Sequence, residues 1–250
     1  MKMSRTLDSH GVLEIVIDNQ EKRNALDDEM IGYLIEQLQT RARLTILRSA
    51  GKYFCAGRDI ANIDPDDDQS MQPLRALALA FRNASQPVLA IVQGPAIGLG
   101  VSIACWSDLC LSSTEARFAI PEGRIGIAPT ITAASLLEIV GRKRCLDMCL
   151  TARSLTAAQA HDYGIVQYLA TPDRIHDAKR DIVDRVLQAA PEALALSRSL
   201  INSLHEDAFH NHLELAARQA LVSARSATAA EGLKAFREKQ SPSWVPREPA

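Results

Sequence analysis

Aromatic side chains are scarce in this 250-residue chain, and an excess of basic charge is missing. Phe, Trp and Tyr make up 4% of it, so the core and any ligand pocket must be built mostly from aliphatic side chains. Lys and Arg number 28 against 30 Asp and Glu. Binding to nucleic-acid phosphates needs a basic surplus or a strongly basic face. This balance argues against nucleic acid as the main partner, but it leaves room for a local cluster of cations that holds one phosphorylated ligand.

Paired cysteines and a long uninterrupted apolar run are also missing. The five Cys include no Cys-x-x-Cys pair, and the N-terminal MKMSRTLDSHG has no apolar run of the kind found in a secretion signal. Free, mostly buried thiols in a reducing cytoplasm are therefore expected. The longest apolar stretch, residues 88–106, is interrupted by Gln93, Pro95 and three glycines, which leaves it short of the roughly 18 residues of a membrane span. We expect a cytoplasmic protein without membrane contact.

The hydrophobic pattern predicts strands in the first half of the chain. Compact apolar runs predict them at residues 12–17, 44–47 and 88–92. The last run is bounded by Pro87 and Gly94 and is apolar throughout, which is typical of a strand covered on both faces. Apolar residues at helical spacing from Leu26 to Leu38 predict a helix, and Asn24 is expected to cap it.

The second half of the chain is predicted to be helical. Helices are expected at residues 130–140, at 156–164, and beyond Pro172 to about Lys239 with breaks at Pro191 and Asn211. Thr156 and Gln159 form a T-x-x-Q capping box at the start of one of them. The fold class is therefore α/β. We predict a core over residues 1–190 and a helical C-terminal region over residues 191–250.

Two glycine-containing segments are candidate sites. In residues 53–60 (YFCAGRDI), small residues would let the backbone approach a ligand closely and present free amides to an anion. An ordinary tight turn is the alternative for this segment. Residues 93–100 (QGPAIGLG) follow a buried strand and open a helix, whose first amides suit an oxyanion or a phosphate. Their glycine spacing fits neither a dinucleotide-binding turn nor a P-loop.

A third candidate is Glu122, which lies between apolar residues and glycine in residues 118–126 (FAIPEGRIG). A carboxyl group in an apolar wall has a raised pKa and can exchange protons near neutral pH. A solvated loop carboxylate is the alternative interpretation.

Two sequence patterns resemble metal sites but lack the residues or the spacing that such sites need. Three aspartates imitate the opening of a calcium loop: Asp64, Asp66 and Asp68. Gln69 stands where that loop needs glycine, and Arg75 stands where it needs a bidentate glutamate. Three histidines cluster late in the chain: His205, His210 and His212. Their spacing is not that of H-E-x-x-H, so we interpret them as surface residues. No metal site is predicted, and no G-x-S-x-G motif of a serine hydrolase occurs.

Taken in order, these segments resemble the enoyl-CoA hydratase/isomerase (crotonase) family from about residue 12 to residue 239. The stretches that carry the resemblance are N-x-x-K-R-N-A-L (19–26), FCAGRDI (54–60), QGPAIGLG (93–100), Asp108, FAIPEGRIGI (118–127), GRKRCLDMCLTAR (141–153), TAAQAHDYGIV (156–166) and FREK (236–239). The resemblance implies a spiral of ββα units whose C-terminal helices build homotrimers or dimers of trimers. It also implies an acyl- or enoyl-CoA thioester as substrate, with no cofactor beyond the CoA that the substrate carries.

By position in these motifs, the backbone amides of Arg58 and Leu99 should form an oxyanion hole that stabilises an enolate. One such donor is typically worth about 3 kcal/mol. The loop at residues 56–59 should hold the adenine and pantetheine of CoA. The substrate-binding residues that the resemblance implies are Lys22, Arg23, Ala56, Gly57, Asp59, Ile60, Gly98, Ser102, Thr130 and, from a neighbouring subunit, Lys239.

The departures from the family pattern bear on the reaction. Hydratases of this family commonly use two glutamates, of which the second matches Glu122 and the first falls on Ser102. The usual P-G-x-G-G-T is replaced by Ala-Pro-Thr-Ile-Thr at residues 128–132, one residue shorter than usual up to Gly141. Thr130 is nearest to the aspartate that dienoyl isomerases and a related dehalogenase carry there.

We therefore predict a hydratase/isomerase-type enzyme in which Glu122 alone moves protons against an enolate held by the Arg58 and Leu99 amides. Hydration and double-bond isomerisation both remain open. A thioester hydrolase or decarboxylase of the same family is an alternative, as is a CoA-ester-binding protein without catalysis. The region from Ile60 to Leu79 is expected to line part of an aliphatic acyl pocket.

Overall fold

The computed structural model describes residues 2–60, 67 and 69–246. Within these residues, a six-stranded sheet with the order β1-β2-β3-β4-β6-β9 forms the centre of the molecule. Its strands are β1 (Met3–Leu7), β2 (Val12–Ile17), β3 (Leu44–Ser49), β4 (Val88–Val92), β6 (Leu109–Ser113) and β9 (Tyr168–Ala170). β1 pairs antiparallel with β2, and the remaining pairs are parallel. The strands predicted at residues 12–17 and 88–92 are confirmed, and the one at 44–47 extends to Ser49.

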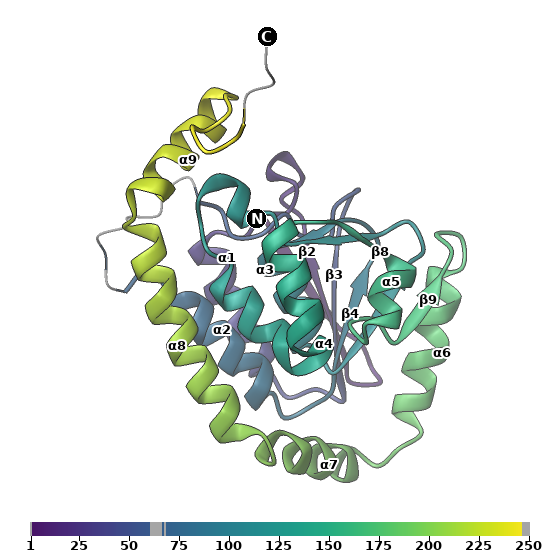
Figure 1. Cartoon of the computed structure of the whole chain (residues 1–250). Helices are drawn as coiled ribbons and strands as arrows, with labels where there is room; N and C mark the ends of the chain where they lie inside the picture. Colours follow the sequence, from purple (N-terminus) through teal and green to yellow (C-terminus); the bar gives the residue numbers. More distant parts are fainter. Residues whose placement is uncertain (1, 61–66, 68, 247–250) are drawn as a thin grey trace.

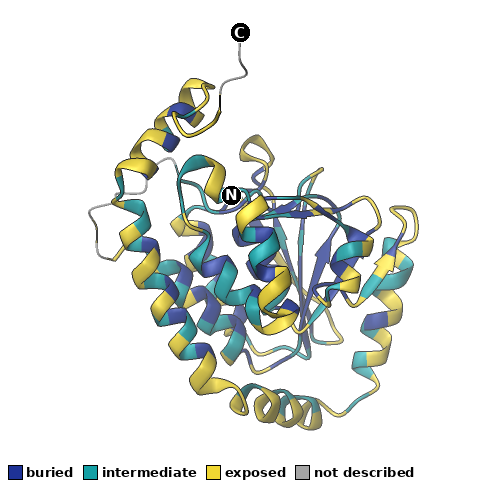
Figure 2. Cartoon of the chain, in the orientation of Figure 1, coloured by how far each residue is buried: buried dark blue, intermediate teal, exposed yellow. Residues whose placement is uncertain are grey.

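Helices cover both faces of this sheet (Figures 1 and 2). The helices that pack on the two faces are α1 (Asp28–Leu38), α2 (Gln72–Asn83), α3 (Leu99–Trp106) and, on the opposite side, α6 (Ile175–Leu187). In β4, Leu89 and Ile91 pack toward Ile182 of α6, whereas Ala90 and Val92 belong to the larger core on the other face. A strand that is buried on both faces has a continuous apolar sequence, which explains the sequence of β4.

The loop before α1 corrects one prediction. Asn24 does not cap this helix. Asp27 does, because its Oδ1 accepts a hydrogen bond from the amide of Met30 at 3.0 Å. Asn24 instead adopts φ +60°, and its Nδ2 donates to the carbonyl oxygens of Ala50 at 2.8 Å and Tyr53 at 2.7 Å. The asparagine thus ties the loop before α1 to the loop after β3.

A small sheet positions the candidate site. Its strands, in the order β5-β7-β8, are β5 (Ala96–Ile97), β7 (Arg117–Ala119) and β8 (Leu155–Thr156). The pairing of β5 with β7 brings the start of α3 beside the short 3-10 helix η2 (Glu122–Ile125) that follows β7. The helix predicted at 130–140 begins as expected at Thr130, but α4 (Thr130–Thr151) continues beyond a kink at Gly141, where φ is +73°. α5 (Ala157–Asp162) opens on the predicted capping box.

The C-terminal helices α7 (Pro191–Ser203), α8 (Glu206–Ala224) and α9 (Ala227–Glu238) wrap around one side of the molecule (Figure 1). Pro191 begins α7 as predicted. The break predicted at Asn211 is wrong, because this residue lies inside α8. The buried stripe of α8 runs past it from Phe209 to Leu213, and packing of that stripe outweighs the low helix propensity of a single asparagine. No helix of the described residues is long and apolar enough to cross a membrane.

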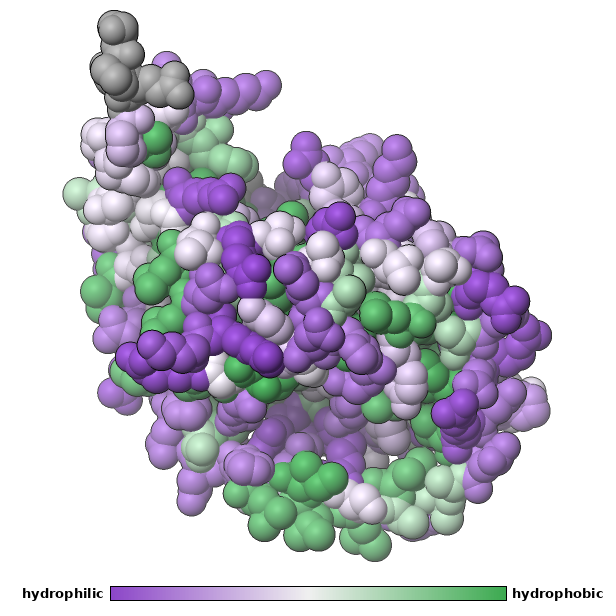
Figure 3. All heavy atoms as spheres, turned by 45° about the vertical axis from the view of Figure 1, so that its right-hand side comes forward, coloured by the Kyte–Doolittle hydropathy of each residue, from purple (hydrophilic) through white to green (hydrophobic). Residues whose placement is uncertain are grey.

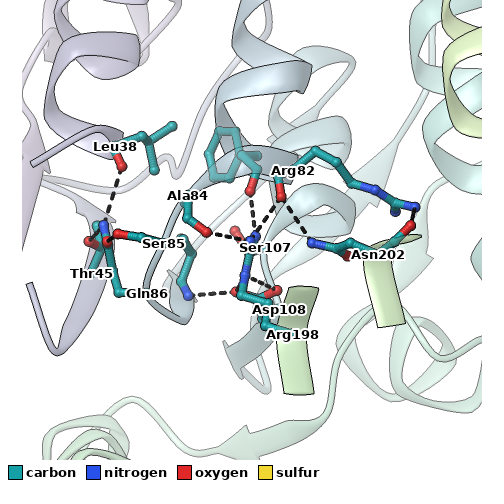
Figure 4. Close-up of polar contacts among 12 residues, drawn as sticks. Leu38, Thr45, Arg82, Ala84, Ser85, Gln86, Ser107, Asp108, Arg198 and Asn202 are labelled. Carbon is teal, nitrogen blue, oxygen red and sulfur yellow. Dashed lines mark hydrogen bonds and ion pairs between the residues drawn. The ribbon is translucent and has the colours of Figure 1, made fainter. Parts of the chain in front are cut away.

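Arg198 fastens α7 to the core (Figure 4). Its Nη1 donates to the carbonyl oxygens of Arg82 at 2.9 Å and Ala84 at 2.6 Å, where α2 ends. Its Nε pairs with the carboxylate of Asp108, and that carboxylate also accepts a hydrogen bond from the amide of Val88. The last carbonyls of a helix lack partners within the helix. One guanidinium therefore satisfies the end of α2 and pairs with an acid whose side chain is 26% exposed.

We expect Arg198→Met to lower the free energy of unfolding by about 1–3 kcal/mol, because it removes the donor to the last carbonyls of α2 together with the charged partner of Asp108. The Arg198 side chain is 10% exposed. Arg185→Met is the matched control, because the Arg185 pair with Asp181 is 67% and 60% exposed. Such a surface pair contributes about 0–1 kcal/mol. Urea unfolding measures both variants, and equal losses would show that Arg198 does not fasten α7.

Candidate active site

A cavity of about 760 Å³ lies among the loop that ends at Ile60, the start of α3, the helix η2 and α9. Most of its lining is apolar. The acidic side chains that line it, within the described part of the chain, are Asp59 and Glu122. Its remaining polar lining consists of backbone, hydroxyl groups, a few basic side chains and the carboxamide of Gln240. The cavity therefore suits a ligand that is largely apolar at one end.

Among the backbone amides on its wall, those of Arg58 and Leu99 have no acceptor within the described residues. Leu26 bonds to the residues on either side of Arg58, since its amide donates to Gly57 and its carbonyl accepts from Asp59. The Arg58 N–H therefore lies on the opposite edge of this segment. Leu99 is the first residue of α3, where an amide has no partner within the helix.

Gly57 lets these two segments approach each other. Its φ is +106°, and a Cβ atom there would lie 3.3 Å from the carbonyl oxygen of Ile97 and 3.9 Å from the nitrogen of Leu99. The 57–58 backbone thus lies directly against the backbone that leads into α3. Two free N–H groups on facing segments are suited to bind one oxyanion.

Glu122 provides the carboxyl group of the cavity. Burial raises its pKa to about 7, although bonds from its own backbone amide and from the Thr132 hydroxyl oppose the shift. Its Oε1 lies against Gly98, where a Cβ atom would be 2.5 Å away. Its buried Oε2 has no hydrogen-bond partner in the described structure. This carboxyl group can therefore exchange a proton near neutral pH with a group bound in the cavity.

Ser102 and Thr132 form a hydroxyl pair beside Glu122. Ser102 is fully buried on α3, and its Oγ donates to Oγ1 of Thr132 at 3.2 Å. Thr132 in turn bonds to the Glu122 carboxyl group. The sequence analysis assigned no role to Thr132. The signal that could have found it is the unusual Ala-Pro-Thr-Ile-Thr segment, because Thr132 lies two residues after Thr130 on the first turn of α4.

Some of the predicted cationic residues line the cavity and one does not. Lys22 and Arg23 line the cavity, and Lys22 pairs with Asp59 at 2.5 Å. Arg124 of η2 also lines it, and the sequence analysis missed this residue. Lys239 ends α9 with φ +54° and is absent from the lining of its own chain's cavity. Its predicted role in a neighbouring subunit stays a prediction.

Arg58 contributes its amide to the cavity wall, while its side chain is bound on the protein. The guanidinium pairs with Asp28 at 2.9 Å and donates to the carbonyl oxygen of Ser70 at 2.6 Å. The side chain is 8% exposed. These bonds hold the loop that carries the Arg58 amide against α1 and the start of α2. The remaining predicted contacts that line the cavity are Ala56, Gly57, Ile60, Gly98, Ser102 and Thr130.

The acyl region expected between Ile60 and Leu79 is described in part. Met71 and Leu74 line the cavity there, whereas residues 61–66 and 68, which include Asp64, Asp66 and Asp68, lie outside the described residues. Leu233 and Phe236 of α9 line the cavity as well. No group of His, Cys, Asp and Glu in the described chain could hold a metal ion.

α9 packs on η2 backbone to backbone. A Cβ atom on Gly232 would lie 2.2 Å from the carbonyl oxygen of Ile125, and one on Gly126 would lie 2.3 Å from that of Thr228. Glycine at both positions allows this contact. The C-terminal helix of the chain therefore closes the chain's own cavity.

Free amides and a largely buried carboxyl group in one apolar cavity of an α/β fold are suited to an enzyme that moves protons next to a carbonyl group. The family model for enoyl-CoA hydratase/isomerase matches residues 8–247. The chain belongs to this family, as the sequence motifs predicted, and is an enzyme of the hydratase/isomerase type that acts on CoA thioesters.

Relatives and solved structures agree with this assignment. The chain is 28% identical to 1,2-epoxyphenylacetyl-CoA isomerase of Escherichia coli, over 94% of this chain and 95% of that protein. It is 29% identical to carnitinyl-CoA dehydratase of Proteus mirabilis, over 99% of this chain and 100% of that protein. The crystal structure of an enoyl-CoA hydratase/isomerase from Pseudoalteromonas atlantica superposes with a TM-score of 0.89 at 26% identity, covering 98% of this chain and 100% of that one. The predicted fold class is confirmed.

We expect Gly98→Ala to lower kcat/KM for an enoyl-CoA at least about 100-fold, because the new methyl group would displace the Glu122 carboxyl group and the Leu99 amide together. The φ of +54° at Gly98 adds backbone strain. Gly32→Ala on α1 is the matched control, since a Cβ atom there meets nothing within 4 Å. Steady-state kinetics with a circular dichroism check of folding measures the effect. Unchanged kinetics in Gly98→Ala would contradict this geometry.

Proposed function

We propose that this protein isomerises enoyl-CoA thioesters by moving a proton between C2 and C4 of the acyl chain. The amides of Arg58 and Leu99 bind the thioester oxygen, and Glu122 is the acid and base. One observation carries the proposal. Glu122 is a largely buried acid with a pKa of about 7, and it lines the same cavity as two amides without acceptors.

The proton transfer balances without another reactant. Ionised Glu122 removes a proton from C2 of a 3-enoyl-CoA, and the electron pair of the C–H bond moves onto the thioester oxygen as a dienolate. The two amides stabilise this negative charge, and each donor typically contributes about 3 kcal/mol. Glu122 then returns its proton at C4, the double bond moves to C2–C3, and the carboxylate is restored.

The polar groups of the cavity favour isomerisation over hydration. Hydration needs a group that activates water in addition to one that protonates C2. Ser102 stands where relatives carry a first glutamate, and its proton is already donated to Thr132. A hydroxyl group does not act as a carboxylate base at neutral pH. Asp59 is paired with Lys22.

Hydration is the second candidate function. The unpartnered Oε2 of Glu122 and the oxygen of Ser102 could accept hydrogen bonds from one water molecule. Product analysis separates this reaction from isomerisation. Release of a free CoA thiol would instead identify thioester hydrolysis, and carbon dioxide would identify decarboxylation.

The CoA part of the substrate supplies its own nucleotide, so we propose that no separate cofactor takes part. Lys22, Arg23 and Arg124 line the cavity and are proposed to meet the CoA phosphates. Lys239 of a neighbouring subunit is proposed to do the same. All five cysteines are free, which supports a cytoplasmic location for the protein.

We expect Glu122→Gln to slow exchange of the C2 proton of an enoyl-CoA about 10²–10⁴-fold, because it removes the acid and base while keeping the side-chain size. Incubation in deuterated water with NMR detection measures this exchange. Binding of the CoA ester should persist. Glu115→Gln, at an exposed loop position, is the control. Activity of Glu122→Gln within tenfold of the parent would contradict the assignment of Glu122 as the acid and base.

The same exchange assay should depend on pH through Glu122. The carboxyl group must be ionised to remove the C2 proton, and its pKa is raised to about 7. We therefore expect kcat/KM to rise with pH up to an inflection near 7 and to level off above it. An inflection near the ordinary glutamate pKa of about 4.3 would assign the base to a solvated carboxylate instead.

We also propose that the chain assembles as a homotrimer or dimer of trimers. Four large apolar side chains are 62–72% exposed: Leu196, Leu200 and Ile201 of α7, and Leu204 directly after that helix. Figure 3 shows apolar residues gathered at the bottom of the molecule, where α7 lies in Figure 1. An apolar patch of this kind is typical of an interface between subunits.

Sedimentation velocity should give species of three or six chains, and Leu200→Glu should shift them to smaller ones because it places a charge in the interface. Leu150→Glu, at an exposed leucine of α4, is the control. A parent protein that sediments as a monomer at micromolar concentration would contradict the assembly.

A further inference from the structure

One hydroxyl group in the cavity has no role in the proton transfer. Oγ1 of Thr130 is buried and has no hydrogen-bond partner in the described structure, and it lines the same cavity as Glu122. Buried polar groups in native proteins nearly always have a partner. A group of this kind in a ligand cavity is therefore expected to receive its partner from the ligand.

The neighbouring hydroxyl groups do not share this property. The Ser102 proton is donated to Thr132, and Thr132 bonds to Glu122. Ser102 and Thr132 thus both have a partner within the protein. Besides the two backbone amides that bind the thioester oxygen, Thr130 is the hydroxyl donor of the described lining that remains available to the ligand.

The chemistry of the cavity limits what Thr130 can bind. A ligand carboxylate is disfavoured, because a second negative charge near Glu122 would oppose its ionisation, on which the proton transfer depends. Apolar side chains such as Ile131 and Leu74 line the same cavity as Thr130 and suit a carbon chain. A neutral oxygen on that chain would accept the Thr130 hydrogen bond without adding charge.

We propose that Thr130 is a specificity-determining residue that donates a hydrogen bond to a neutral oxygen on the acyl chain, beyond the reacting carbons C2–C4. The preferred substrates are then enoyl-CoA thioesters that carry a hydroxyl or oxo group on the distal chain. This inference rests on the proposed isomerisation, because that reaction places C2–C4 at Glu122 and leaves the distal chain to Thr130.

The test compares 3-heptenoyl-CoA with its 5-hydroxy, 6-hydroxy and 6-oxo derivatives. In the parent protein we expect kcat/KM for at least one oxygenated substrate to exceed that of the plain one about tenfold. Thr130→Val should reduce this ratio to near one, because it keeps the shape and removes the donor. Thr130→Ser should restore it, and Thr114→Val, at an exposed threonine, should leave it unchanged.

The outcomes separate this inference from the proposed function. Isomerisation of 3-heptenoyl-CoA without preference for any oxygenated derivative would overturn the role of Thr130 and leave the proposed reaction intact. An oxygen preference that persists in Thr130→Val would also overturn it. If the plain and oxygenated substrates all fail to isomerise or exchange the C2 proton, the proposed function itself fails. A preference limited to the hydroxy or to the oxo derivatives identifies which oxygen Thr130 recognises.

Discussion

The site depends on the contact between the Glu122 carboxyl group and the α-carbon of Gly98. The pairing of β5 with β7 and the hydrogen bond from the Gly98 amide to the Ala119 carbonyl at 3.0 Å bring the two residues together. The same bonds set the direction of the Leu99 amide, because it follows Gly98 directly. The Glu122 carboxyl group, the Leu99 amide and the small sheet therefore form one structural unit. A shift of either strand would move the acid and the donor relative to each other.

This arrangement costs stability that the rest of the fold must offset. Glu122 binds its proton more tightly in the folded chain than in the unfolded one, since its pKa is raised from 4.5 to about 7. Stability linked to this group is thus greatest at low pH and falls as pH rises from about 4.5 through about 7. The two hydrophobic cores, one on each face of the sheet, and the bonds of Arg198 to α2 and Asp108 offset this cost.

Local signals in the sequence predicted the strand at 88–92 and the capping box of α5, because each depends on neighbouring residues alone. The helix cap at Asn24 was predicted wrongly, since the bonds of its side chain go to a loop about 26 residues further along. Glu122, Arg58 and Leu99 could be named because they stand in motifs. Thr132 and Arg124 stand in segments that the sequence also singles out, but no role is predicted for them because their place at the cavity depends on how η2 and α4 pack. The roles assigned to all these residues stay predictions.

The packing of α9 on η2 has a consequence for how the chain is made. The wall formed by Gly232, Leu233 and Phe236 is synthesised after every described strand of the two sheets. Until then, the aliphatic lining of the cavity faces solvent on a domain whose sheet is already complete. Exposed apolar surface of this kind promotes aggregation of folding intermediates. Translation that stops before α9 would thus release a chain with a folded sheet and an open cavity, whose exposed apolar lining promotes aggregation.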